Sequence, residues 1–138
     1  MKNYAIILAG GMGLRMGSVV PKCSLKLTEK SILEETISVF ENSELVDDII
    51  VVVPELENIS KSHKKNLKYV LGGATRGQSI INAITTIEDE DAHLIIHDGV
   101  RPLLAPDVVQ KGLQELANYD VVKTVEKSHN DIISFEKV

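Results

Sequence analysis

The stretch that decides the fold lies at residues 4–17, YAIILAGGMGLRMG. It begins with an apolar run at residues 4–8, which is typical of a strand buried on both faces, as in a parallel sheet. Four glycines follow within eight residues, at Gly10, Gly11, Gly13 and Gly17. Because glycine tolerates unusual dihedrals and lets other atoms approach closely, the stretch predicts a buried strand and then a loop that lies against a ligand or another part of the chain.

Outward from this stretch, short apolar runs alternate with longer amphipathic segments. Strands are expected at residues 4–8, 49–53, 67–71, 94–96, 119–125 and 131–135, with 67–71 nearer an edge of the sheet. The order of elements predicts an α/β protein with right-handed crossovers. We expect one domain over residues 1–138, a three-layer α/β/α Rossmann-like sandwich with a mostly parallel sheet.

Helices are indicated by apolar residues at helical spacing, at Leu33, Ile37 and Phe40, at Ile80, Ile84 and Ile87, and at Val109, Leu113 and Leu116. Ser31 with Glu34 predicts a capping box for the first helix, and Pro106 is suited to open the third. A further helix is expected over residues 55–65. The basic cluster around it is interpreted as a solvated helix face; it comprises Lys61, Lys64, Lys65 and Lys68.

The composition excludes several classes of protein. The chain has 138 residues, 43% apolar and 25% charged, which is ordinary for one globular domain. Its net charge of −5 disfavours nucleic-acid binding, which needs a basic face. A single cysteine cannot form an internal disulfide, and no apolar run approaches the roughly 18 residues of a membrane helix. Because no signal-peptide pattern is present, we expect a cytoplasmic protein without a membrane partner.

The glycine-rich loop has the chemistry of an anion site. Backbone N–H groups in such a loop can cradle a phosphate, Arg15 offers a planar fork, and Lys22 adds a point charge. Two common phosphate motifs fail by counting. The dinucleotide fingerprint needs glycine where Met16 stands, and the P-loop needs lysine where Ser18 stands. A glycine turn without a ligand remains the alternative.

Two later segments carry further polar groups. Residues 72–79, GGATRGQS, join a weak strand to a helix, and Ser79 lies where a hydroxyl could cap that helix or bind a ligand. Residues 97–102, HDGVRP, follow a buried strand. Asp98 suits a ribose hydroxyl or a hydrated Mg²⁺, whereas Arg101 suits a second phosphate or an ion pair with Asp98. His97 is interpreted as a structural histidine.

These motifs resemble known families. The glycine-rich loop, the R-M-G at residues 15–17 and the P-K at residues 21–22 resemble the signature of nucleotidyltransferases that activate sugars and polyols. The two later segments, G-G-x-x-R-x-x-S and H-D-x-x-R-P, resemble the polyol-phosphate cytidylyltransferases in particular, over essentially the whole chain. The resemblance implies a fold of the nucleotide-diphospho-sugar transferase type. It also implies CMP transfer from CTP to 2-C-methyl-D-erythritol 4-phosphate or to ribitol 5-phosphate or a related pentitol phosphate, with release of pyrophosphate, in isoprenoid or in wall or capsule polymer synthesis.

The resemblance also implies roles for individual residues. The catalytic pair that holds the triphosphate is Arg15 and Lys22. The nucleotide-binding set is Ala9, Gly10, Gly11, Gly13, Gly73, Ala74, Ser79, Asp98 and Gly99. The acceptor side is assigned to Asp98 and Arg101. Mg²⁺ is the expected cofactor, no protein metal ligand is assigned, and Cys23 is expected to pack rather than to act as a nucleophile.

The sequence also departs from the family. Relatives continue well past the position of Val138, through a dimerisation arm and further basic residues. We therefore expect a chain truncated at its C-terminus, with an exposed sheet edge that invites association. A homodimer is one expectation that the sequence leaves open. The opening 8–11, LAGG, favours the pentitol-phosphate branch.

Two other functions remain open from the sequence. The first loop would equally suit a nucleotidyltransferase that uses UTP, GTP or ATP. A truncated module that binds a nucleotide without turnover is the alternative from another class of protein.

Overall fold

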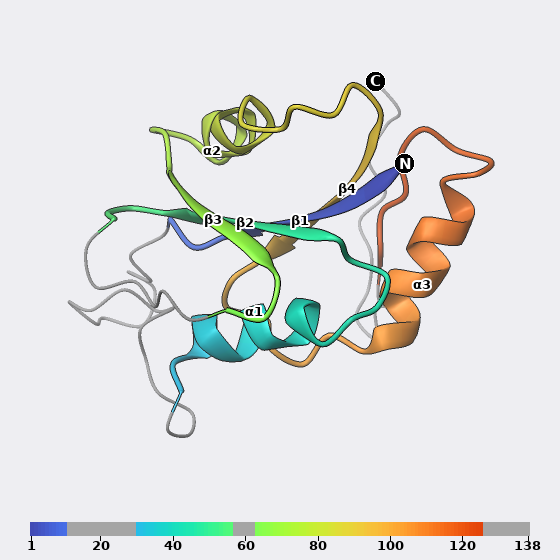
Figure 1. Ribbon diagram of the computed structural model, residues 1–138, viewed down its shortest axis with the longest axis horizontal. Coiled ribbons are helices and arrows are strands. Elements are labelled where there is room, and N and C mark those ends of the chain that lie inside the picture. Colours follow the sequence, from blue (N-terminus) through green and yellow to red (C-terminus); the bar gives the residue numbers. More distant parts are fainter. Residues whose placement is uncertain (11–29, 57–62, 126–138) are drawn as a thin grey trace, which may run out of the picture.

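The computed structural model describes residues 1–10, 30–56 and 63–125. This part of the chain contains four strands and three helices, in the order β1, α1, β2, β3, α2, β4, α3 (Figure 1). The strands are β1 (Lys2–Leu8), β2 (Asp48–Val53), β3 (Asn66–Leu71) and β4 (Ala92–Asp98). The helices are α1 (Ile32–Glu41), α2 (Arg76–Ile84) and α3 (Pro106–Glu115). The predicted α/β class is confirmed.

The strands form one parallel sheet in the order β3-β2-β1-β4. The register pairs Leu8 with Asp98 and Val53 with Leu71, so all four strands end at the same side of the sheet. β3 lies at an edge, as its sequence predicts. The other edge is β4, where Ile96 is 43% exposed.

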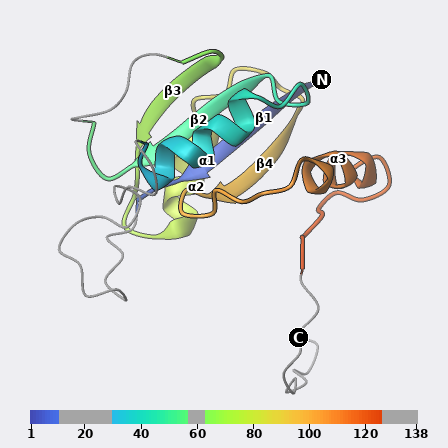
Figure 2. The same ribbon diagram turned by 90° about the horizontal axis from the view of Figure 1, so that it is seen from below.

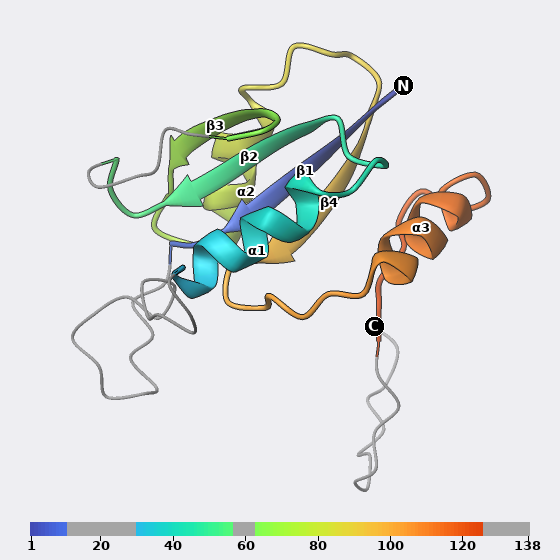
Figure 3. The same cartoon turned by 60° about the horizontal axis from the view of Figure 1, so that its bottom comes forward.

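The sheet is covered on both faces, which confirms the three-layer architecture. α2 lies on one face and α1 on the other (Figures 1 and 3). Because successive side chains of a strand point to opposite faces, β1 and β2 contribute side chains to two cores, one on each face of the sheet. The core on the α2 side contains Tyr4, Ile6, Ile50, Val52 and Ala83. The core on the α1 side includes Ala5, Ile7, Ile37, Phe40, Ile49 and Val51. Fully burying each large aliphatic side chain stabilises the fold by about 1.5–3 kcal/mol.

α1 begins as its sequence predicts. The Ser31 hydroxyl accepts from the Glu34 N–H at 3.2 Å, and the Glu34 carboxylate accepts from the Ser31 N–H at 2.7 Å. These two bonds satisfy backbone donors that the first turn leaves without helical partners. The capping box is confirmed.

α3 begins at Pro106 and lies beside β4, away from the middle of the sheet (Figure 2). Val109 is buried, and Leu113 packs against the α1-side core. After α3 the prediction is wrong: residues 119–125 are not a strand, and Val121 and Val125 are each 83% exposed. β-Forming side chains are not sufficient, because a strand also needs a neighbour for its backbone hydrogen bonds. The strand expected at 131–135 lies outside the described residues.

α2 differs from its prediction in position and in buried face. The helix begins at Arg76, and its buried residues are Ser79 and Ala83. Ile80 is only partly buried, and Ile84 is 39% exposed. The small Ser79 and Ala83 side chains therefore form the buried face of the helix, and the predicted stripe is wrong for Ile80 and Ile84. Ile87, which lies past the end of the helix, does pack against the α2-side core.

The helix expected over residues 55–65 is absent from its described ends, 55–56 and 63–65. The interpretation of the lysines as a solvated helix face is wrong in its helix, because Lys64, Lys65 and Lys68 lie outside the helices, but Lys64 and Lys68 are exposed as expected. Lys65 is partly buried, and its Nζ donates to the carbonyls of Ser43 and Val46, just after α1. Lys68 lies in β3 and donates to a carbonyl in the turn after α2. Lys64 Nζ donates to Asn42 Oδ1 at 3.2 Å, and Lys61 lies outside the described residues.

Candidate functional site

The carboxyl ends of β1 and β4 lie side by side. The Gly99 N–H donates to the Leu8 carbonyl at 2.8 Å, and the Ala9 N–H donates to the Val52 carbonyl at 2.8 Å. The glycine-rich loop therefore leaves the sheet between β2 and β4. Ligands of open α/β sheets bind beyond the carboxyl ends of the strands, so this side of the sheet is the candidate site.

Gly99 is fixed by close packing. A Cβ atom at this position would lie 3.0 Å from the Leu8 carbonyl oxygen and 3.1 Å from Leu33 Cδ1. Its own carbonyl accepts from the buried Thr36 hydroxyl at 2.9 Å. These contacts hold the turn after β4 against both β1 and α1, and so fix the backbone next to Asp98.

The second glycine segment follows β3. The Gly73 N–H donates to Ser79 Oγ at 3.0 Å, which folds the loop back onto the helix. A Cβ atom at Gly73 would lie 2.3 Å from Gln78 Cγ, so the loop depends on this close approach. The capping part of the Ser79 prediction is corrected, because Thr75 is the N-cap and accepts from the Gln78 N–H at 3.0 Å. Ser79 lies inside the helix, 8% exposed, with its hydroxyl toward the loop.

Asp98 joins the second and third segments. Its Oδ1 lies 3.2 Å from Arg76 Nη2, and its Oδ2 accepts from Arg101 Nε at 3.1 Å. Of the two alternatives that the sequence left open for Arg101, the ion pair with Asp98 is observed. Two guanidinium groups on one carboxylate leave a net charge of +1 on these three exposed side chains, which suits an anionic ligand.

Arg76 has no role in the sequence-based assignment. The feature of the sequence that could have indicated a role is its position as the arginine of the G-G-x-x-R-x-x-S segment. A helix N-terminus and a strand end 22 residues apart (98 − 76) meet only through the fold.

His97 makes structural contacts, in agreement with its interpretation. Its Nε2 lies 2.8 Å from the Arg101 carbonyl oxygen. Its ring packs edge-to-face against Phe40, with 5.3 Å between ring centroids. The histidine thereby braces the turn that presents Arg101.

The structure thus brings together, around the strand ends, six of the residues that the sequence assigns to the site: Ala9, Gly73, Ser79, Asp98, Gly99 and Arg101. Gly10 and Ala74 are exposed there. The remaining predicted residues lie outside the described ones: Gly11, Gly13, Arg15, Lys22 and Cys23.

Among the described residues, no three histidine, cysteine or acidic side chains group as metal ligands would. No helix in that part of the chain is long and apolar enough to cross a membrane.

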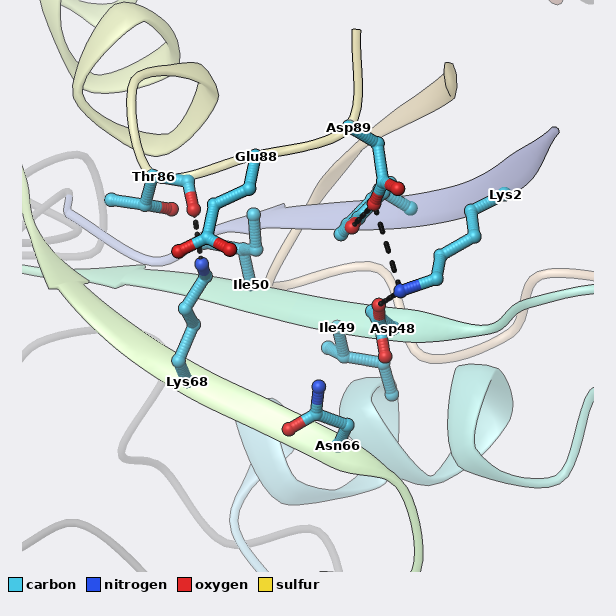
Figure 4. Close-up of a pocket in the computed structure, with 10 residues that line it drawn as sticks. Lys2, Asp48, Ile49, Ile50, Asn66, Lys68, Thr86, Glu88 and Asp89 are labelled. Carbon is cyan, nitrogen blue, oxygen red and sulfur yellow. Dashed lines mark hydrogen bonds and ion pairs between the residues drawn. The ribbon is translucent and has the colours of Figure 1, made fainter. Parts of the chain in front are cut away.

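A hollow of about 580 Å³ lies at the opposite, amino-terminal side of the sheet (Figure 4). Lys2 lies there 3.2 Å from Asp48 and 3.6 Å from Asp89. The Tyr4 hydroxyl donates to Asp89, and this bond, with the burial of the ring, raises the pKa of Tyr4 to about 12. Lys2, Asp48 and Asp89 together carry one net negative charge, and the two described motifs, at residues 72–79 and 97–102, lie at the other side of the sheet.

The fold and its loops define a class of protein: an α/β domain of the nucleotide-binding type, with glycine-rich segments at the carboxyl ends of parallel strands. Residues 3–128 match the family model described as IspD, 2-C-methyl-D-erythritol 4-phosphate cytidylyltransferase. The chain belongs to this family.

Two similar relatives have different names. The chain is 38% identical over 125 residues to the 2-C-methyl-D-erythritol 4-phosphate cytidylyltransferase of Clostridium tetani, covering 86% of this chain and 50% of the relative. It is also 38% identical over 130 residues to the bifunctional ribulose 5-phosphate reductase/CDP-ribitol pyrophosphorylase Bcs1 of Haemophilus influenzae, covering 88% of this chain and 27% of the relative. The chain thus spans half, or less, of the length of these two relatives.

The fold is similar to that of solved members of the family. The 2-C-methyl-D-erythritol 4-phosphate cytidylyltransferase of Francisella tularensis matches with a TM-score of 0.72 and 29% identity, over 86% of this chain and 54% of the other. This likeness confirms the nucleotidyltransferase type of fold.

Proposed function

We propose that this chain is the nucleotide-binding part of a cytidylyltransferase that transfers CMP from CTP to a phosphorylated polyol. The observation that supports this most directly is Asp98, which lies at the end of β4 between Arg76 and Arg101 and next to the start of the glycine-rich loop. Membership of the family supplies the reaction. The acceptor is 2-C-methyl-D-erythritol 4-phosphate or a pentitol 5-phosphate such as ribitol 5-phosphate, and equal identity to one relative of each kind favours neither.

The proposed reaction needs no protein nucleophile. A phosphate oxygen of the acceptor attacks the α-phosphorus of CTP, a new P–O bond forms, and the bond to the bridging oxygen of the β-phosphate breaks. Pyrophosphate leaves with that oxygen. Catalysis then consists of positioning and of neutralising the developing charge, which we assign to Arg15 and Lys22.

The described residues suggest how the substrates are divided between the loops. We assign the base to Gly73 and Ser79, through backbone and hydroxyl groups, and the triphosphate to the loop that begins at Ala9 and Gly10. We assign the ribose and the acceptor phosphate to Asp98 and Arg101.

Mg²⁺ is proposed as the cofactor on chemical grounds. It is usually held by one or two carboxylates together with substrate phosphates and several waters. An ion bound in this way enters with the triphosphate and needs no dedicated cluster of protein ligands. Its chemistry there is the neutralisation of phosphate charge.

The first experiment is calorimetric titration of the chain with CTP, UTP, GTP and ATP in the presence of Mg²⁺. We expect CTP to bind in preference to the other three, and we expect Lys22→Ala to abolish binding. The matched control is Lys111→Ala, which removes an exposed cation on α3 that pairs with Asp107. Preference for another nucleotide would favour a different nucleotidyltransferase, and a folded chain that binds none would refute the proposal.

Turnover is a separate measurement. Pyrophosphate release is followed with CTP and either polyol phosphate, on this chain and on a version extended by the second half of a relative. Release only by the extended version would favour the alternative, a nucleotide-binding module without turnover of its own. A cytoplasmic location and a homodimer stay predictions.

A further inference from the structure

Arg76 occupies a position that helix stability does not explain. It is the first residue of α2, and the first turn of that helix contains no acidic residue. A cation is electrostatically unfavourable at a helix N-terminus, where the macrodipole is positive. The cap itself is provided by Thr75. The arginine therefore owes its place to its partner, Asp98, at 3.2 Å.

Asp98 in turn orients Arg101. The hydrogen bond to Asp98 uses the Nε of Arg101. No ion pair or hydrogen bond occupies the two Nη groups of Arg101 within the part of the chain described here. A guanidinium held through Nε presents its Nη edge as a planar fork, and such forks bind phosphate in two parallel bonds. The Arg101 side chain as a whole is 72% exposed and is therefore accessible to a ligand.

We infer that Arg76 is a positioning residue: through Asp98, it orients Arg101 to bind the phosphate group of the acceptor. This inference rests on the proposed function and deepens it. Arg76 fixes one carboxylate oxygen, the carboxylate plane fixes Nε of Arg101, and the Nη edge of Arg101 binds the phosphate. The Arg76 charge also keeps the three-residue group at +1 instead of zero.

A purely structural role is the weaker explanation. The side chains of Arg76, Asp98 and Arg101 are 57%, 37% and 72% exposed. Ion pairs this exposed contribute little to stability. The turn after β4 is already held by the backbone bond of Gly99 to Leu8 and by the Thr36 hydroxyl. Loss of Arg76 should leave the fold intact and change only the direction of Arg101.

The test is a double-mutant cycle with the variants Arg76→Met, Arg101→Met and the double variant. The chain is saturated with a CTP analogue that has a methylene bridge between its α- and β-phosphorus, so that no turnover occurs. Dissociation constants for ribitol 5-phosphate and 2-C-methyl-D-erythritol 4-phosphate are then measured by calorimetry. The matched control is Lys111→Met, which removes one exposed positive charge from α3.

We expect each single variant to weaken acceptor binding about tenfold, the scale of one lost charge-assisted contact. Because both act through one contact to the ligand, the double variant should also lose about tenfold, whereas independent sites would lose about a hundredfold. Arg76→Lys should restore most of the affinity, since only one of its nitrogens contacts Asp98. Arg101→Lys should not, because it lacks the fork.

Several results would overturn the inference. One is a double variant whose loss of acceptor affinity equals the product of the two single losses. Others are an Arg76→Met variant that binds the acceptor normally, or one that loses as much affinity for the CTP analogue as for the acceptor. A chain that binds the analogue but neither acceptor would also overturn it. A chain that does not bind the analogue refutes the proposed function instead. The contact is then judged without ligand, by hydrogen exchange of the Arg101 Nε–H in NMR spectra. Arg76→Met should accelerate this exchange, and unchanged exchange would refute the positioning role.

Discussion

Replacing Gly99 by alanine tests whether the turn after β4 is as tightly packed as the structure indicates. The added methyl group would lie 3.0 Å from the Leu8 carbonyl oxygen, 3.1 Å from Leu33 Cδ1 and 3.2 Å from Ala9 Cβ. All three distances are shorter than an ordinary van der Waals contact. The first neighbour is backbone in the central strand, which has little freedom to move.

The expected change follows from two opposing effects. Overpacking of this kind costs typically about 1–3 kcal/mol. Alanine also lowers the conformational entropy of the unfolded chain, which stabilises the fold by about 0.4–1 kcal/mol. We therefore expect Gly99→Ala to lower the free energy of unfolding by about 1–2 kcal/mol.

Gly112 provides the matched control. It lies inside α3, and a Cβ atom there would meet nothing within 4 Å. Because alanine is favoured over glycine in a helix interior by about 1 kcal/mol, Gly112→Ala should raise the free energy of unfolding. The same chemical change is thus expected to act with opposite sign at the two positions.

The assay is urea unfolding followed by circular dichroism. With a slope of about 2 kcal/mol/M, the midpoint should fall by about 0.5–1 M for Gly99→Ala and rise by up to about 0.5 M for Gly112→Ala. Midpoints that move in the same direction, or a stabilised Gly99→Ala variant, would refute the packing argument.

Two further predictions concern a buried hydroxyl and a tyrosine. Thr36→Val should cost about 1–3 kcal/mol in urea unfolding because it leaves the Gly99 carbonyl without its 2.9 Å partner. Thr36→Ser keeps the hydroxyl and should cost about 1 kcal/mol for one lost methyl group. A Thr36→Val variant as stable as the parent would contradict the role of the hydroxyl. The hydrogen bond to Asp89 and burial raise the pKa of Tyr4 to about 12. Its hydroxyl should therefore ionise at a higher pH than that of a tyrosine in the unfolded chain. Its contribution to stability is complete below about pH 10 and lost as the pH rises towards 12, and phenolate absorbance, with Tyr4→Phe as the control, measures this directly.

Local sequence patterns were sufficient for most of the fold. The apolar runs of β1 and β2, the Ser31 capping box and the proline that opens α3 depend on residues close together in the chain, so periodicity and spacing identify them. Predictions failed where the outcome depends on distant partners. Residues 119–125 have a strand-like sequence and no neighbouring strand among the described residues. Lys65 looked like part of a solvated face and instead donates to carbonyls after α1.

The sequence by itself determined the class of fold and which segments carry polar groups at the strand ends, because glycines, alternation and capping residues act over a few residues. Only the tertiary structure decided which of those groups meet. The parallel register sets Leu8 beside Asp98, and the strand order and the N-terminus of α2 bring Arg76 to the same carboxylate. That encounter depends on the relative placement of a helix and a strand, a property that no local pattern specifies.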